Sequence, residues 1–183
     1  NVGGGPGGGP RLSYHRRMMF QQGRTWNALG AAACFAMLAF ALYSEKVLGL
    51  APCPLCMFQR VGVLALGIVF ALAALHHPGR VGGYVYAVLI VLAAGVTVAI
   101  AARHVYVQSL PPGTVPACGA SLDFMLEVFP LLEVVRKVMT GGGECARVDW
   151  RFLGLSMPAW VLVAAGFLGV YGAAVNSERR RPR

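Results

Sequence analysis

Four long stretches of the chain are dominated by apolar residues and almost free of charge, at about 26–44, 57–75, 81–102 and 154–175. As a helix rising about 1.5 Å per residue, each is long enough to cross about 30 Å of hydrocarbon. The first stretch has no small-x-small cleavage site and is of membrane-spanning length, so we interpret it as a helix rather than a cleavable signal peptide. The pattern predicts an all-α membrane protein with four transmembrane helices.

The connections between these stretches indicate how the helices are arranged. Only the short turn HHPGR, residues 76–80, separates the second helix from the third, which requires the two to be antiparallel neighbours. Residues 45–56 join the first two helices. The third and fourth are joined by residues 103–153, a loop much longer than usual connections. We expect an antiparallel four-helix bundle with one long loop at one end.

The long loop has a pattern of its own. In SLDFMLEVFPLLEVVRKVM, residues 121–139, charges at regular spacing interrupt an apolar majority. This mixture predicts one or two short helices lying in the membrane interface and broken at Pro130. The alternative is a peripheral packing segment. Gly141 to Gly143 would then form a flexible joint before Cys145.

Composition and charge agree with a membrane protein. The chain is 57% hydrophobic and 13% charged, with a mean hydropathy of +0.62, too apolar for an ordinary soluble domain. The net charge of +9 alone suits a nucleic-acid partner, but the unbalanced positive charge lies before the first helix, in the 76–80 turn and after the fourth helix. By the positive-inside rule both termini are cytoplasmic and the loops 45–56 and 103–153 lie outside, in a bacterial cell in the periplasm. We therefore expect the chain to lie in the lipid bilayer and to have no nucleic-acid partner.

Three regions follow from this organisation. Residues 1–25 open with NVGGGPGGGP, cannot bury a core, and are predicted to be a disordered, basic cytoplasmic segment. Residues 26–176 form the membrane domain. Residues 177–183 are a basic cytoplasmic tail.

The five cysteines divide by topology. Cys34 lies within the first span, where a buried cysteine behaves as a small hydrophobe, and the others lie in the outer loops: Cys53, Cys56, Cys118 and Cys145. Four outer cysteines make two pairs, which are either structural staples or redox centres. Zinc is a third reading, but only one pair has C-x-x-C spacing and the compartment oxidises thiols, so we expect no metal.

The stretch APCPLCMFQR, residues 51–60, favours redox chemistry. A Cys-x-x-Cys ring is too small to brace a fold well and is familiar in thiol exchange. Cys56 lies at the start of the second helix, where free N–H groups and the helix dipole stabilise a thiolate. Arg60 follows one turn later and presents a permanent positive charge on the same face. The alternative for Arg60 is contact with lipid phosphate.

Electrons from these thiols require an acceptor. The chain has no flavin, nicotinamide or haem motif, so a quinone dissolved in the membrane is the simplest choice. Its ring would rest against Cys56, with Arg60 and His104 near its oxygens to stabilise developing negative charge. His104 and Gln108 lie at the outer end of the third helix, four residues apart, and are candidate hydrogen-bond donors, although the residues alone favour ordinary interfacial polar side chains. The non-enzymatic alternative is a membrane adaptor braced by two inert disulfides.

Several motifs together resemble the DsbB family of quinone-linked disulfide-generating membrane proteins. They are PCPLCMFQR at the second helix, RHVYVQ at the end of the third, the two cysteines Cys118 and Cys145 around the long loop, and WRFLGLSMPAW before the fourth helix. The resemblance covers about residues 18–180; the Gly/Pro opening and Cys34 fall outside the family pattern. Vitamin K epoxide reductases are a second quinone-linked family, but there the loop cysteines precede the C-x-x-C, the reverse of this order.

The resemblance implies a relay in the bacterial inner membrane. A reduced DsbA-like periplasmic protein would attack the Cys118–Cys145 disulfide and form a mixed disulfide through Cys118. Cys145 would then reach Cys53 and release Cys56 as a thiolate held by Arg60, which would reduce ubiquinone or menaquinone and restore the Cys53–Cys56 disulfide. The resemblance also places His104 and Gln108 near the quinone. Gln59 stands where relatives carry an acidic residue, so the resemblance assigns it no role.

Overall fold

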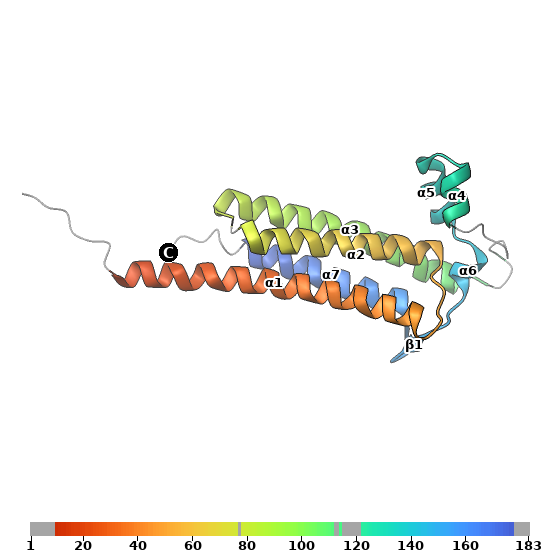
Figure 1. Ribbon diagram of the computed structural model, residues 1–183, viewed down its shortest axis with the longest axis horizontal. Helices are drawn as coiled ribbons and strands as arrows, with labels where there is room; N and C mark the ends of the chain where they lie inside the picture. Colours follow the sequence, from red (N-terminus) through yellow and green to blue (C-terminus); the bar gives the residue numbers. More distant parts are fainter. Residues whose placement is uncertain (1–9, 77, 112–113, 115–121, 178–183) are drawn as a thin grey trace, which may run out of the picture.

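Four long helices make up the bundle of this protein (Figure 1). The structure, a computed structural model, describes residues 10–76, 78–111, 114 and 122–177. The long helices are α1 (Pro10–Lys46), α2 (Pro54–His76), α3 (Arg80–Ser109) and α7 (Met157–Ser177). The segments Gly23–Lys46, Pro54–His76, Val81–Ser109 and Met157–Ser177 are long and apolar enough to cross a membrane. The chain is therefore a multi-pass membrane protein with an all-α bundle, as the hydrophobic pattern predicts.

Two helices extend beyond the limits that the hydrophobic pattern suggests. α1 begins at Pro10, so residues 10–25 are helical rather than disordered. The residues after Pro10 include good helix formers such as Arg, Leu, Met and Gln, and proline itself suits the first helical position. α3 continues to Ser109 because no proline interrupts it before Pro111. His104 and Gln108 therefore lie on the last turns of α3, beyond the limit at 102 that the hydrophobic pattern gives.

Each long helix packs along its neighbours in a closed ring. α1 packs on α2, α2 on α3, α3 on α7, and α7 again on α1. The start of α1 and the end of α7 lie at the same end of the bundle, and the short helices lie at the other (Figure 1). The assignment of the first end to the cytoplasm stays a prediction.

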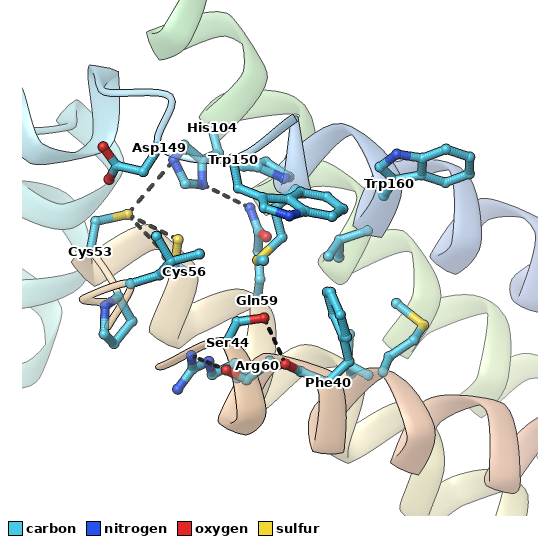
Figure 2. A pocket seen from close by; sticks show the side chains of 18 of the residues that line it. Phe40, Ser44, Cys53, Cys56, Gln59, Arg60, His104, Asp149, Trp150 and Trp160 are labelled. Carbon is cyan, nitrogen blue, oxygen red and sulfur yellow. Dashed lines mark hydrogen bonds between the residues drawn. The ribbon is translucent and has the colours of Figure 1, made fainter. Parts of the chain in front are cut away.

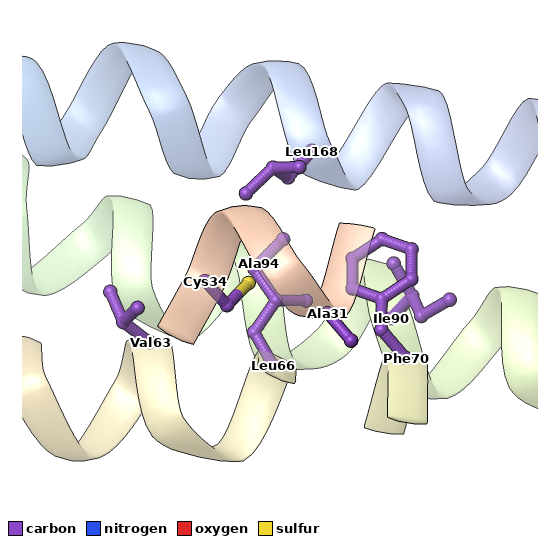
Figure 3. Packing of buried hydrophobic residues seen from close by; sticks show 8 residues of the cluster. All are labelled: Ala31, Cys34, Val63, Leu66, Phe70, Ile90, Ala94 and Leu168. Carbon is purple, nitrogen blue, oxygen red and sulfur yellow. The ribbon is translucent and has the colours of Figure 1, made fainter. Parts of the chain in front are cut away.

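The core between the helices combines small and large apolar side chains (Figure 3). The buried cluster consists of Ala31, Cys34, Val63, Leu66, Phe70, Ile90, Ala94 and Leu168. Gly172 of α7 allows a close approach, because a Cβ there would lie 2.6 Å from Ile90 Cγ2 and 2.7 Å from Phe70 Cζ. Cys34 is fully buried and packs among these residues.

The segment between α3 and α7 folds over one end of the bundle. It contains α4 (Leu122–Val128), α5 (Leu131–Thr140) and α6 (Gly143–Ala146), followed by the strands β1 (Arg151–Phe152) and β2 (Leu155–Ser156). Two short helices on either side of Pro130 confirm that part of the sequence pattern; their position in a membrane interface stays a prediction.

A short hairpin, which the hydrophobic pattern does not reveal, precedes α7. Its strands pair Arg151 with Ser156 and Phe152 with Leu155. The two turn residues, Leu153 and Gly154, have positive φ angles of 50° and 80°. A two-residue turn with positive φ at both positions matches the right-handed twist of the two strands that it joins.

Candidate functional site

The first turn of α2 holds the Cys-x-x-Cys pair. The helix begins at Pro54, which has no N–H to satisfy and a φ suited to a first helical residue. Cys53 immediately precedes it, and its sulfur accepts a hydrogen bond from the Cys56 N–H at 3.4 Å. The two sulfurs are 3.2 Å apart, and both cysteines are free thiols. The arrangement represents the reduced form of the pair.

Cys145 comes to the same place from the long segment between α3 and α7. It lies on α6 and is 1% exposed. Its sulfur, the Cys53 sulfur and a ring nitrogen of His104 all lie within 4.8 Å of one another. Cys145 and Cys53 belong to a buried apolar cluster that also contains Val107 of α3 and Val134 of α5. This packing holds the loop cysteine against the helix cysteine.

The glycines before Cys145 set the path of the chain. Gly141 ends α5 with φ at +84°, a conformation that side chains strain. A Cβ at this position would also lie 2.9 Å from Val107 Cγ2. Gly141 is therefore required for the turn that brings α6 onto the end of α3, which is a more specific role than a flexible joint.

Hydrogen bonding shifts the pKa values of Cys53 and Cys145 in opposite directions. The hydrogen bond to Cys145, followed by that to Cys56 and by burial, raises the pKa of Cys53 far above its ordinary value. The same contact with Cys53 lowers the pKa of Cys145 to about 6 against desolvation, helped by backbone hydrogen bonds of Leu55 and Gly142. Leu55 lies in the first turn of α2, where N–H groups have no helical partner. Cys145 is thus the more acidic thiol of this pair, and Cys53 the less acidic one.

Cys145 should therefore titrate as an acidic thiol only while Cys53 is reduced. In the reduced protein, the rate of alkylation of Cys145 should rise with pH around a midpoint near 6, because the thiolate is the reactive form. Cys53→Ala removes the hydrogen bond that lowers the pKa of Cys145 most. The substitution should therefore move this midpoint upward, toward the ordinary thiol range. Mass spectrometry of the alkylated Cys145 peptide at a series of pH values measures both. An identical midpoint in the two proteins would contradict this assignment.

His104 is a buried link between the cysteines and α2. Its Nε2 lies 3.1 Å from the Cys145 carbonyl oxygen and 3.7 Å from the Cys53 sulfur. A carbonyl only accepts, so Nε2 carries the hydrogen and donates it. Nδ1 of the neutral ring is then an acceptor, and the Gln59 amide donates to it at 3.0 Å. Gln59, itself 4% exposed, thus fixes the tautomer and orientation of His104 (Figure 2).

Arg60 makes its strongest contacts with α1. Its guanidinium donates to the Glu45 carboxylate and, at 3.0 Å, to the Ala41 carbonyl oxygen, with about a fifth of its side chain exposed. Glu45 also lies 3.7 Å from Lys46. The charge of Arg60 is therefore partly neutralised by a residue that the sequence analysis did not single out.

Gln108 fastens the loop to α3. Its amide donates to the Arg147 carbonyl oxygen at 3.4 Å. Its Oε1 accepts a hydrogen bond from the Ser156 hydroxyl at 2.7 Å. Gln108 therefore connects α3 both to the segment after Cys145 and to the hairpin before α7. Cys118, the remaining predicted site residue, lies outside the described residues.

A cavity of about 490 Å³ lies between the helix ends beside these residues (Figure 2). Cys56, Arg60, His104 and Gln108 all line it. The rest of its wall is largely apolar and aromatic, and includes Met37, Phe40, Val63, Trp150, Trp160 and Val161. The size and the mixture of apolar walls with a few convergent polar groups are typical of a small-molecule site.

Three features of this site had weak signals in the sequence. Glu45 is an acidic residue near the end of the first helix. Its charge alone does not reveal that its partner is Arg60, fifteen positions later in the chain. Gln59 precedes Arg60 in the motif, yet its contact with His104 spans two helices. Trp150 and Trp160 lie on the flanks of the hairpin, which the pattern also missed.

A family model and several known proteins match most of this chain. The family model described as "Disulfide bond formation protein DsbB" matches residues 23–175. Disulfide bond formation protein B of Marinobacter nauticus is 49% identical over 150 residues, which cover 82% of this chain and 89% of that protein. The protein of the same name from Nitrosococcus oceani is 53% identical over 142 residues, 78% of this chain and 84% of the relative. That from Xanthomonas axonopodis pv. citri is 52% identical over 154 residues, with 84% and 90% covered.

Proposed function

This chain belongs to the DsbB family of disulfide bond formation proteins, and on that premise we propose that it reoxidises a DsbA-like periplasmic thiol protein and passes the electrons to a membrane quinone. Family membership makes it a disulfide-forming oxidoreductase of the membrane. The partner, the quinone and the inner-membrane topology are the parts that we propose.

One observation carries the proposal: the sulfur of the loop cysteine Cys145 lies beside that of Cys53. Thiol-disulfide exchange requires direct approach of one sulfur to another. A cysteine that braces a loop has no need to lie against a Cys-x-x-Cys pair on another helix. The contact therefore supports electron transfer between the two pairs.

The proposed sequence of exchanges conserves atoms and electrons. The partner's thiolate attacks Cys118 of a Cys118–Cys145 disulfide, forms the mixed disulfide and releases Cys145 as a thiolate. Cys145 attacks Cys53, breaks the Cys53–Cys56 bond and releases Cys56 as a thiolate. The partner's second thiol resolves the mixed disulfide, and Cys118 returns to Cys145, which frees Cys53. Reformation of Cys53–Cys56 then yields two electrons and two protons.

The cavity beside Cys56 fits the ring of a quinone in size and lining. A bound quinone would accept the two electrons and two protons. Arg60 and Gln108 both line the cavity. The positive charge of Arg60 and the amide of Gln108 would stabilise the negative charge that the ring oxygens gain during reduction. His104 would donate its Nε2 hydrogen to the Cys145 carbonyl oxygen and so hold Cys145 beside Cys53, because Gln59 occupies its other nitrogen. The residues of this chain thus bind, orient and stabilise charge.

Quinone reduction by the purified protein in detergent tests this function. The donor is a reduced thioredoxin-fold periplasmic protein, and absorbance follows ubiquinone or menaquinone. We expect turnover with at least one quinone and a lower rate in Arg60→Ala. A correctly folded wild type that reduces neither quinone, and whose disulfides are indifferent to partner thiols, would instead be the disulfide-braced adaptor.

Glu45→Gln should raise the efficiency of quinone reduction. The substitution leaves the positive charge of Arg60 unpaired at the cavity wall, while the Ala41 carbonyl still holds the guanidinium. We expect kcat/KM for quinone to rise roughly two- to fivefold, the range of a partly exposed ion pair. Lys46→Gln is the matched control, because Lys46 contacts the same carboxylate from its exposed side. A fall similar to that of Arg60→Ala would show that Glu45 positions Arg60 rather than restraining its charge.

A further inference from the structure

The reduced site gathers three soft donor atoms around one point, with a fourth beside one of them. The sulfurs of Cys53 and Cys145 and a ring nitrogen of His104 lie within 4.8 Å of one another. The Cys56 sulfur lies 3.2 Å from that of Cys53. Cys53, His104 and Cys145 are 6%, 1% and 1% exposed, so water and competing ligands have little access.

We propose that the fully reduced protein binds one soft divalent cation, such as Zn²⁺ or Cd²⁺, through Cys53, Cys56, Cys145 and His104, and that this cation blocks thiol exchange. Three thiolates and one imidazole are a common zinc donor set. The inference goes beyond the proposed function, since it concerns a ligand that takes no part in electron transfer.

The distances are close to those that a tetrahedral ion requires. Zinc bonds of about 2.3 Å to sulfur and 2.0–2.1 Å to nitrogen place neighbouring donors roughly 3.5–3.8 Å apart. The Cys53 sulfur is 3.7 Å from His104 Nε2 and 3.2 Å from the Cys56 sulfur. These two distances therefore need shifts of only about half an ångström. The Cys56 sulfur, which is outside the group of three donors, would turn toward the ion to complete the shell.

Contacts around the four proposed ligands also favour metal binding. The Cys56 N–H points at the Cys53 sulfur and would stabilise it as a thiolate. Gln59 contacts the second nitrogen of His104, the kind of outer contact that orients a metal-bound imidazole. On binding, Nδ1 would carry the hydrogen and the Gln59 amide would turn its oxygen to accept it.

Binding the cation is an acid–base step without electron transfer. Each thiol that becomes a ligand loses one proton to solvent, and the cation takes its place. A Cys53–Cys56 disulfide removes two of the four donors. The cation and the disulfide therefore exclude each other, so the metal would trap the reduced enzyme reversibly.

The test is a metal titration of the reduced, desalted protein in detergent without oxygen, quinone or partner. Ultraviolet thiolate-to-metal absorbance follows Cd²⁺, and competition with a chromophoric chelator follows Zn²⁺. We expect about one equivalent bound, an affinity at least about tenfold lower in His104→Gln and Cys145→Ser, and no change in Cys34→Ser. The oxidised wild type, which needs no substitution, should bind none.

Two results would overturn the proposal: no binding by the reduced protein, or equal binding by wild type, His104→Gln and Cys145→Ser. Because the titration contains neither quinone nor partner, its outcome is independent of the proposed function. In the quinone assay, added Zn²⁺ should inhibit turnover, and a chelator should restore it. Inhibition that the chelator does not reverse would contradict a reversible metal site.

Discussion

Cys145→Ser should abolish partner-driven quinone reduction while sparing reduction driven by a small dithiol. The variant keeps Cys53, Cys56 and the cavity, so a dithiol that attacks Cys53 directly can still deliver electrons. A protein partner loses its route, because Cys145 is the sulfur that lies against Cys53. We expect the partner-driven rate to fall roughly a thousandfold or more, as for removal of a nucleophile.

Parallel assays with the reduced partner and with dithiothreitol measure this separation. Cys34→Ser is the matched control, since it removes a thiol that is buried in the core between the helices and away from the exchange. Equal loss with both donors would mean that Cys145 supports the structure of the site. Unchanged partner-driven turnover would mean that electrons bypass it.

Cys56→Ser should stop quinone reduction with every thiol donor. Both cysteines of the first pair line the cavity, together with Arg60 and His104. Without Cys56, no disulfide can reform on α2, so two electrons cannot leave the pair. A loss of roughly a thousandfold or more is expected with the partner and with dithiothreitol alike.

The same variant should still accept the partner at the loop pair. With a partner variant that lacks its second thiol, non-reducing gel electrophoresis should therefore reveal a mixed disulfide that accumulates, because no thiol of the partner can resolve it. Substantial quinone reduction by Cys56→Ser would contradict its place as the last thiol before the acceptor. Failure to form the mixed disulfide would place the first exchange elsewhere in the chain.

The sequence predicted the existence of the four long helices better than it predicted their limits or the hairpin before α7. Apolar stretches of spanning length identify α1, α2, α3 and α7 because lipid imposes both length and composition on them. Helix limits were less accurate: α3 continues to Ser109 because the polar residues after 102 do not themselves end a helix. The hairpin at 151–156 depends on Leu153 and Gly154, a pair outside the usual turn signals.

The site was predicted by residue type more than by geometry. The position of Cys53 and Cys56 at the start of a helix follows from the apolar run that begins beside them. The approach of Cys145 depends on α5 and α6 packing over the end of α3, a contact between segments far apart in the chain. For the same reason the pattern favoured Arg60 as a partner of Cys56, whereas its guanidinium pairs with Glu45 across the loop.

The most direct test of the account is a single turnover without oxygen or partner. The protein is reduced, desalted and mixed with one equivalent of quinone, and quinol, remaining thiols and the new disulfide are then counted. The account predicts one quinol for every two thiols lost. Mass spectrometry should find the new disulfide between Cys53 and Cys56 or, after exchange through Cys145, between Cys118 and Cys145. Quinone that stays oxidised beside a folded protein with all its thiols intact would contradict it.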